Sequence, residues 1–269
     1  MTDGRAELDF NTFADTYDNV GYVCKPAERL VVNAKIIPGQ RVLDVACGTG
    51  WATMAAARAV GNTGKVTGID IADKMLDVAR GKAASGGLSN VEYCLGDTEA
   101  LEFNDATFDA VICATAIYLL RDIPKALHEW RRVLKAGGTV AFSSYGKNHL
   151  QPVSRLLFER LARYEGQAPP VRQPSGKTVT LYKCRELLKR AGFEDIEITT
   201  EQLGEHLQDT TAYLKEISST YRFMMTRLSP AELEKFKVEH LAEVESLRTG
   251  QGFWLDVPTI FNVAKKPSV

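Results

Sequence analysis

The chain has 269 residues, of which 45% are hydrophobic and 25% charged, and its formal net charge is −1. Such a composition is typical of a globular protein, and the near-zero charge gives no electrostatic reason to expect nucleic acid as a partner. The first ten residues lack the basic and apolar regions of a signal peptide, and no apolar run approaches the roughly 18 residues of a membrane span. Five cysteines without a CxxC spacing favour reduced, buried thiols, so a cytoplasmic protein is expected.

Strand and helix signals alternate along the chain from residue 41 onward. Short runs rich in branched apolar residues predict strands, and apolar residues spaced three and four apart predict helices between them. Strands are expected at 41–46, 65–69, 91–95, 108–114 and 139–143, with helices at 52–60, 73–82 and 124–134. Repeated strand–helix units predict an α/β protein whose mostly parallel sheet is covered by helices on both faces.

The last part of the chain predicts two more strands with a helical insertion between them. The segment RELLKRAGFEDIEITT is typical of a helix followed by a sixth strand, and GFWLDVPTIFNVAKK of a seventh, antiparallel strand. In the insertion, Ser229-Pro230-Ala231-Glu232 has the pattern of a capping box that opens a helix. An apolar stripe at helical spacing precedes it and consists of Leu214, Ile217, Tyr221, Met224, Met225 and Leu228.

These signals divide the chain into four parts. We expect an N-terminal helical cap segment at residues 1–38 and a sheet core at 39–204, with an insertion around 146–178. A helical lid is expected at 205–249, followed by the last core strand and a C-terminal tail at 250–269. Met and aromatic side chains of the lid suit an apolar ligand, but packing of the two helices on each other and on the core explains most of the same stripes.

Acidic residues stand at the ends of three successive predicted strands. Asp44 precedes the small-residue turn at 46–50, Asp70 ends the second strand, and Asp97 follows the third. Open parallel sheets bind ligands beyond the carboxyl ends of their strands, and the backbone N–H groups of a turn that opens a helix suit a carboxylate. Since the acids would repel a phosphate, a ligand with a carboxylate, an ammonium or sulfonium, a ribose and a base fits better. S-adenosylmethionine is that ligand.

The order of the motifs resembles that of class I S-adenosylmethionine-dependent methyltransferases. VLDVACGTG is similar to their first motif, GIDIADKML to the second, and LGDTEAL, FDAVICATAIYLL and VLKAGGTVAFSSY to the next three, while FADTYD resembles their N-terminal segment. Five motifs in order are far more specific than any one of them. The subgroup most resembled is that of small-molecule enzymes related to ubiquinone/menaquinone methyltransferases, over about residues 10–145 and 180–200. The resemblance implies a Rossmann-like, doubly wound seven-stranded sheet, mostly parallel with an antiparallel last strand, plus a helical lid.

The resemblance also implies roles at the methionine end of the cofactor. Gly48 and Gly50 would let the backbone approach the methionine part, with a plain strand-to-helix turn as the alternative. Asp44 would organise the methionine ammonium, through water, and Tyr17 would close over the carboxylate, with burial under the cap segment as the alternative. The first glycine of the usual motif is replaced by Ala46, which still leaves room for a close ligand. The cofactor-binding residues expected here are Tyr17, Asp44, Ala46, Gly48, Thr49 and Gly50.

At the ribose and adenine end, Asp70 would accept hydrogen bonds from both ribose hydroxyls, with capping of the next helix as the alternative. Asp97 would bind the adenine amino group and the Thr98 backbone N–H the adjacent ring nitrogen. The alternative for Asp97 is that it caps its own turn. Ile71 and Met75 would sandwich the adenine, although Met75 also has the spacing of a core residue. The cofactor-binding residues expected here are Asp70, Ile71, Met75, Asp97, Thr98 and Thr115.

No constellation of residues fixes a general base. Tyr22 and His149 are the catalytic candidates, while His128 is expected to be structural and His240 solvated on a polar helix. In-line methyl transfer at a sulfonium depends largely on holding the two reacting groups in place, so a base is helpful but not required. Metal-dependent O-methyltransferases place acids after the fourth strand, where this chain has Cys113-Ala114-Thr115, so no metal is expected.

The function that these patterns favour is S-adenosylmethionine-dependent methylation of a small, hydrophobic organic acceptor at O, C or N. One alternative is a nucleic-acid or protein methyltransferase, but the segment after the fourth strand is ATAIY rather than Asn/Asp-Pro-Pro-Tyr/Phe, and no basic stripe is present. A second is an NAD-dependent oxidoreductase, because Asp70 stands at the distance from the turn expected of a ribose-binding acid. GTGWAT lacks the third glycine of that fingerprint, however. A protein that binds the cofactor without catalysis is a third alternative, and the oligomeric state stays open.

Overall fold

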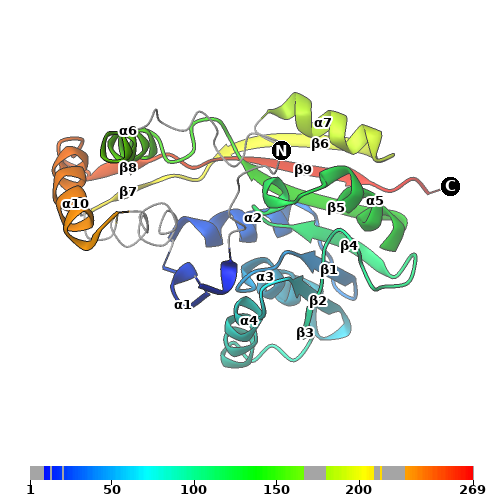
Figure 1. Cartoon of the computed structure of the whole chain (residues 1–269). Coiled ribbons are helices and arrows are strands. Elements are labelled where there is room, and N and C mark those ends of the chain that lie inside the picture. The colour runs from blue at the N-terminus through cyan, green and yellow to red at the C-terminus, as the bar shows by residue number, and fades with distance from the viewer. Residues whose placement is uncertain are drawn as a thin grey trace.

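The structure is a computed structural model that describes residues 9–12, 14–19, 21–166, 180–208, 213 and 228–268. Its centre is a seven-stranded sheet with the strand order β3-β2-β1-β4-β5-β9-β6 (Figure 1). The strands of this sheet are β1 (Arg41–Val45), β2 (Lys65–Asp70), β3 (Val91–Leu95), β4 (Phe108–Cys113), β5 (Leu134–Tyr145), β6 (Glu194–Gln202) and β9 (Pro258–Lys265). The order reverses direction between β1 and β4, which is where such sheets form a crevice.

The strand directions confirm the predicted mixed sheet. Neighbouring pairs from β3 to β5 are parallel, with Val42 of β1 opposite Val66 of β2 on one side and Ala110 of β4 on the other. The last strand, β9, runs antiparallel to both β5 and β6. Among the first five strands, the start of β5 differs most from the prediction: β5 begins at Leu134 rather than Thr139, although its ladder to β9 starts only at Thr139. The glycine pair Gly137-Gly138 therefore lies inside the strand and not before it.

Helices cover both faces of the sheet. On one face, α2 (Cys24–Asn33) and α3 (Trp51–Val60) pack on the apolar side chains of the central strands. On the other face, α5 (Ile123–Val133) and α7 (Leu181–Arg190) enclose the largest apolar cluster, with Trp130 fully buried. The helix α4 (Asp73–Ser85) contacts β2 and β3. Three short 3-10 turns, η2 (Gly21–Val23), η3 (Gly61–Thr63) and η4 (Ile117–Leu119), connect these elements.

A second, smaller sheet extends the last strand pair beyond the core. After β6, the chain continues into β7 (Glu205–Leu207), which pairs antiparallel with β8 (Phe253–Leu255) just before β9. Figure 1 shows α6 (Val153–Glu165) and α10 (Pro230–Glu245) beside this sheet, at the end of the molecule opposite α5 and α7. The predicted insertion thus begins with a strand rather than a helix, because residues 205–207 continue the direction of β6.

The second helix of the predicted lid is confirmed, and Ser229 and Glu232 form the expected capping box at its start. One expectation about this helix is wrong: His240 is 1% exposed, and its Nε2 lies 2.7 Å from the Tyr213 hydroxyl. The helix is polar on one side only: Phe236 and Val244 join an apolar cluster on the other side, and the His240 ring lies against those of Phe236 and Tyr213. The predicted apolar stripe, apart from Leu228, lies outside the described residues.

Within the described part of the chain, no helix combines the length and the hydropathy needed to cross a membrane. The cysteines are free, as expected, but their burial varies. Cys113 and Cys184 are buried, Cys24 and Cys47 are half-buried, and Cys94 is exposed at the end of the edge strand β3.

Candidate functional site

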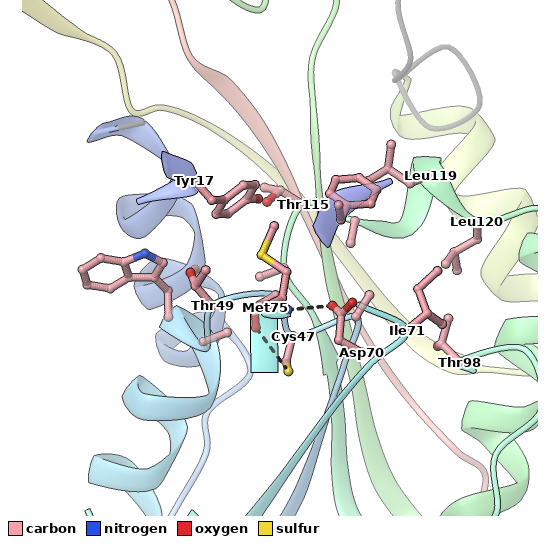
Figure 2. A pocket seen from close by; sticks show the side chains of 18 of the residues that line it. Tyr17, Cys47, Thr49, Asp70, Ile71, Met75, Thr98, Thr115, Leu119 and Leu120 are labelled. Atoms are coloured by element: carbon pink, nitrogen blue, oxygen red, sulfur yellow. Dashed lines mark hydrogen bonds between the residues drawn. The ribbon is translucent and has the colours of Figure 1, made fainter. Parts of the chain in front are cut away.

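A cavity lies at the carboxyl ends of β1, β2, β3 and β4, where the sheet order reverses (Figure 2). Three segments form what we call the cavity floor: the turn at 46–50 after β1, residues 70–72 at the end of β2, and residues 96–99 after β3. Part of the N-terminal segment lies over it. Ten of the predicted cofactor-binding residues line this cavity: Tyr17, Ala46, Gly48, Thr49, Asp70, Ile71, Met75, Asp97, Thr98 and Thr115. Two others, Asp44 and Gly50, do not.

The turn after β1 requires an unusual backbone. Ala46, Gly48 and Gly50 all have φ between 51° and 84°, a backbone region that residues other than glycine rarely adopt. A Cβ atom on Gly48 would meet no atom within 4 Å, because this residue faces the cavity. On Gly50, a Cβ would lie 2.7 Å from the Tyr93 hydroxyl. The two glycines thus differ in role: Gly48 leaves space for a ligand, whereas Gly50 lets α3 pack against β3.

Asp70 joins the parts of the cavity floor. Its Oδ2 accepts a hydrogen bond from the Gly48 N–H at 2.8 Å (Figure 2). Its Oδ1 accepts one from the Ala72 N–H at 2.9 Å. Burial raises the pKa of this carboxyl, although the backbone N–H groups oppose the shift. The alternative expectation, that Asp70 caps the next helix, describes one of its two contacts. The side chain also borders the cavity, where its oxygens can accept further bonds.

Asp44 lies behind the floor and is fully buried. Its Oδ2 accepts a hydrogen bond from the Thr53 hydroxyl at 2.6 Å, while its Oδ1 has no partner among the described residues. Burial raises the pKa of Asp44 to about 7, against the lowering effect of Thr53 and with a smaller raising effect from Asp70. Burying a carboxyl oxygen without a hydrogen-bond donor costs folding free energy. Packing alone therefore does not explain an acid at this position, which indicates a further role for Asp44.

At the opposite end of the cavity, the loop after β3 is held by α5. The Asp97 carboxylate is exposed and accepts a hydrogen bond from the Glu99 N–H at 2.8 Å, so its turn-capping alternative is present. The Trp130 indole N–H donates to the Thr98 hydroxyl at 2.8 Å and contacts the Thr98 carbonyl at 3.2 Å. This role of Trp130 has no sequence signal, because a tryptophan on a helix stripe is indistinguishable from any other core residue.

Ile71 and Met75 both border the cavity, at opposite levels of burial. Figure 2 shows both side chains at the cavity, and Ile71 is 62% exposed whereas Met75 is 1% exposed. Met75 also packs against Ala14 and Ala72 in a small apolar cluster, so it is both a core residue and a wall of the site. Thr115, at the end of β4, has a φ of 49° and donates its N–H to the Ser143 hydroxyl at 3.0 Å. Left-handed residues other than glycine are often found at functional sites.

Residues 9–12 and 14–19, which we call the N-terminal cover, close one side of the cavity. The cover contains η1 (Phe10–Thr12) and the short α1 (Ala14–Tyr17), and Phe10 and Tyr17 line the cavity. Burial, reinforced by the charges of Asp70 and Asp18, raises the pKa of Tyr17 to about 12, so its hydroxyl stays neutral. Phe10 lies outside the motifs that the sequence singles out, and its position follows only from the path of the chain.

The two catalytic candidates meet in an aromatic cluster, although neither lines the cavity. The His149 ring stacks on Tyr145 at 3.7 Å with an interplanar angle of 6°, and the Tyr22 ring lies 5.3 Å from His149 in an edge contact. Burial lowers the pKa of His149 to about 3, and its Nδ1 has no partner among the described residues. Tyr17 and Tyr118 pack against the apolar cluster that contains Tyr22 and Tyr145, so this cluster adjoins the cavity wall.

Comparison with known proteins agrees with the motifs at the floor of the cavity. The sequence profile of the ubiE/COQ5 methyltransferase family matches residues 16–166, more than half of the chain. The chain belongs to this family. The match includes the turn after β1 and the ends of β2, β3 and β4, and it confirms the methyltransferase resemblance of the sequence at the level of the family.

Individual relatives are similar over the same part of the chain. A demethylmenaquinone methyltransferase of Staphylococcus aureus is 36% identical over 151 residues, or 52% of this chain and 62% of the relative. The aklanonic acid methyltransferase DauC of a Streptomyces species is 36% identical over 137 residues, or 50% of this chain and 62% of the relative. The chain therefore matches less than two thirds of either protein.

Among solved structures, the YcgJ protein of Bacillus subtilis has a TM-score of 0.60 and covers 90% of this chain and 98% of its own. At 21% identity, this likeness concerns the fold, and it confirms the predicted Rossmann-like architecture.

Proposed function

We propose that this protein transfers the methyl group of S-adenosylmethionine to a small, largely apolar, quinone-type acceptor. The observation that carries the proposal is the cavity floor, where a left-handed glycine turn, a buried acid at the end of β2 and an exposed acid after β3 border one cavity. The names of the two relatives support the acceptor class, since one acts on a demethylated menaquinone and the other on aklanonic acid.

The cavity fits the cofactor in the chemistry of its walls. Gly48 offers open space beside a helix N-terminus, which suits the methionine carboxylate. Asp70 would accept from the ribose hydroxyls, and Asp97 with the Thr98 backbone would bind the adenine edge between Ile71 and Met75. Asp44 would act one layer behind, where its unpartnered Oδ1 can accept a hydrogen bond through water towards the methionine ammonium. S-adenosylmethionine, when bound, supplies a methyl group on a sulfonium that a nucleophile displaces in line.

The aromatic cluster around Tyr22, Tyr145 and His149 supports the placement of the acceptor on the Tyr17 side of the cavity. Flat rings in this cluster can stack on a flat acceptor and exclude water. With its pKa lowered to about 3, His149 stays neutral at physiological pH. Its buried Nδ1, unpartnered among the described residues, would accept a hydrogen bond from an acceptor hydroxyl only where the acceptor extends from the cavity into this cluster. The chain's own contribution is then to hold the acceptor in line, with Tyr22 and His149 orienting it.

The division of the chain is part of the same proposal. A cap at 1–38 and a lid at 205–249 would enclose the acceptor over the core at 39–204, with residues 250–269 completing the sheet. Burial of apolar side chains from α6, α10 and the β7–β8 sheet in one cluster with Tyr22 supports this arrangement. A cytoplasmic location and methylation at O, C or N remain predictions.

Calorimetry with S-adenosylhomocysteine and with NAD tests the proposal against the oxidoreductase alternative. We expect binding of S-adenosylhomocysteine and none of NAD, and the reverse result would overturn the proposal. Asp97→Ala should weaken binding by about 1 kcal/mol, as for the loss of one hydrogen bond. Asp109→Ala is the matched control, because Asp109 lies at the start of β4, away from the cavity. Its carboxylate accepts hydrogen bonds from the Lys135 ammonium and the Arg41 N–H. Turnover of a demethylated menaquinone analogue, compared with that of an oligonucleotide, separates the acceptor classes.

A further inference from the structure

Asp18 lies near the end of the N-terminal cover. Its carboxylate accepts hydrogen bonds from three separate parts of the chain. Its Oδ1 accepts hydrogen bonds from the Thr49 hydroxyl at 2.6 Å and from the Trp51 indole N–H at 2.8 Å. Its Oδ2 accepts from the Lys82 ammonium at 2.7 Å. Thr49 belongs to the cavity floor, Trp51 begins α3 and Lys82 lies near the end of α4, so one carboxylate joins the cover to all three.

Lys82 completes the cluster from the other side. Its ammonium lies 3.8 Å from the centre of the Trp51 ring and 3.4 Å from the Thr49 hydroxyl. The side chains of Lys82 and Asp18 are 22% and 29% exposed, so this ion pair is partly shielded from water and salt. Burial lowers the pKa of Lys82, while the Asp18 carboxylate opposes that shift. Charged hydrogen bonds in such a setting are stronger than those of exposed ion pairs.

Neither Asp18 nor Lys82 lines the cavity, but their neighbours do. Tyr17 immediately precedes Asp18, and Thr49 accepts and donates within the cluster while bordering the cavity. The described contacts of the rest of the cover include apolar packing of Ala14 with Ala72 and Met75 and a hydrogen bond from the Lys74 N–H to the Asn11 side chain. Opening the Asp18 contacts would remove the polar attachment next to Tyr17 without breaking any strand pairing, which among the described residues leaves Tyr17 held by its apolar packing alone.

We propose that Asp18 and Lys82 are positioning residues that latch the N-terminal cover over the bound cofactor, so that cofactor exchange requires their ion pair to open. The inference rests on the proposed function, because it takes the ligand of the cavity to be S-adenosylmethionine. A latch of this kind slows dissociation of a bound ligand more than it stabilises the sheet, since the cover can open as a local unit.

The test compares Lys82→Met, Asp18→Asn and the double variant with the wild type. We expect each single variant to speed dissociation of S-adenosylhomocysteine, measured by stopped flow, by roughly 5- to 30-fold, which is less than the full effect of a buried charged hydrogen bond because the pair is partly exposed. The double variant should be no faster than the faster single one, because both remove the same interaction. Lys82→Arg should restore slow dissociation, and the unfolding midpoint of the ligand-free protein should change little.

Asp77→Asn is the matched control on the same helix, because Asp77 forms an exposed ion pair with Arg80 at 2.8 Å and does not contact the cover. It should leave the dissociation rate unchanged. Equal dissociation rates in the wild type and Lys82→Met, or additive effects of the two substitutions, would overturn the latch. If the wild type does not bind S-adenosylhomocysteine, the proposed function fails instead. The latch is then judged by amide hydrogen exchange of residues 9–19, which Lys82→Met should accelerate if the latch exists and leave unchanged if it does not.

Discussion

The floor of the cavity and its N-terminal cover are held by different kinds of interaction. The floor is joined mainly through backbone groups: the Cys47 N–H donates to the Ile69 carbonyl at 2.9 Å, and the Gly96 N–H donates to the Asp70 carbonyl at 3.0 Å. The Asp70 carboxylate adds two bonds, both from backbone N–H groups of the floor. The cover depends on side chains, mainly those of Asp18 and a small apolar cluster. Changes to the floor should therefore disturb both folding and cofactor binding, whereas changes to the cover should disturb binding and exchange alone.

The most damaging single change to the floor should be Gly50→Ala. Alanine at a φ of 84° costs about 1–2 kcal/mol, and its Cβ would lie 2.7 Å from the Tyr93 hydroxyl, adding about 1–3 kcal/mol. We expect urea unfolding to show a stability loss of about 2–5 kcal/mol. Adding Tyr93→Phe should recover the part due to the hydroxyl but not the part due to the backbone. No recovery would mean that the hydroxyl does not matter and that the strained turn, with the Ala79 Cβ at 3.1 Å and the Tyr93 ring, accounts for the loss.

The next largest effect concerns pH and Asp44. Because burial raises the pKa of Asp44 to about 7, the folded protein keeps a proton that the unfolded chain releases above about pH 4. Stability should therefore fall as pH rises from about 4 to 7, by at most about 4 kcal/mol for this group. Relative to the wild type, Asp44→Asn should gain stability between pH 5 and 7.5 in urea unfolding. Parallel pH profiles of the two proteins would contradict the buried-acid interpretation.

Replacing Asp70 should affect both properties of the floor at once. Asp70→Ala should weaken S-adenosylhomocysteine binding by about 1.5–3 kcal/mol, the range for a lost bond to a charged group, which calorimetry can measure. It also leaves the Gly48 and Ala72 N–H groups without their acceptor, so the unfolding midpoint should fall while the fold survives. Unchanged affinity in a folded variant would remove Asp70 from the ligand site and leave it a purely structural acid.

The smallest effect is expected at the cover. Asn11→Ala removes the acceptor for the Lys74 N–H at the start of α4, a loss of about 0.5–1.5 kcal/mol. Because the cover opens locally, faster hydrogen exchange in residues 9–19 should be the main consequence, with little change in global unfolding. A drop in global stability as large as that of Asp70→Ala would mean that cover and floor unfold as one unit, and the distinction between them would fail.

Much of the floor could be predicted because its signals are local. An acid or a glycine directly after an apolar strand marks a strand end, and strand ends of a parallel sheet meet at one edge, so Asp70, Asp97 and Gly48 were placed together without a structure. The cover could not be predicted in this way. Asp18 has partners at residues 49, 51 and 82, and no spacing rule connects an acid to a tryptophan and a lysine on other elements.

The same limit explains the errors in the outer part of the molecule. His240 was expected in solvent because its neighbours in sequence are charged, but Arg160 of α6 pairs with Glu239 and Glu243 and so covers that side of α10. Burial of a histidine depends on what packs against its helix. The meeting of Tyr22 with His149 is a similar long-range result, although each was singled out from its place in the sequence.

The position of β9 has a consequence for how the chain reaches its fold. This strand follows all others of the main sheet in sequence yet lies between β5 and β6, pairing with both. During synthesis, β6 therefore has no neighbour in the sheet until the C-terminal residues have left the ribosome. Contacts between segments that are distant in sequence form slowly, and a strand edge that is unpaired during that time favours aggregation. Deletion of residues 258–268 should leave β6 without a strand partner and make the chain prone to aggregation. This short C-terminal segment therefore determines whether a newly made chain folds or aggregates.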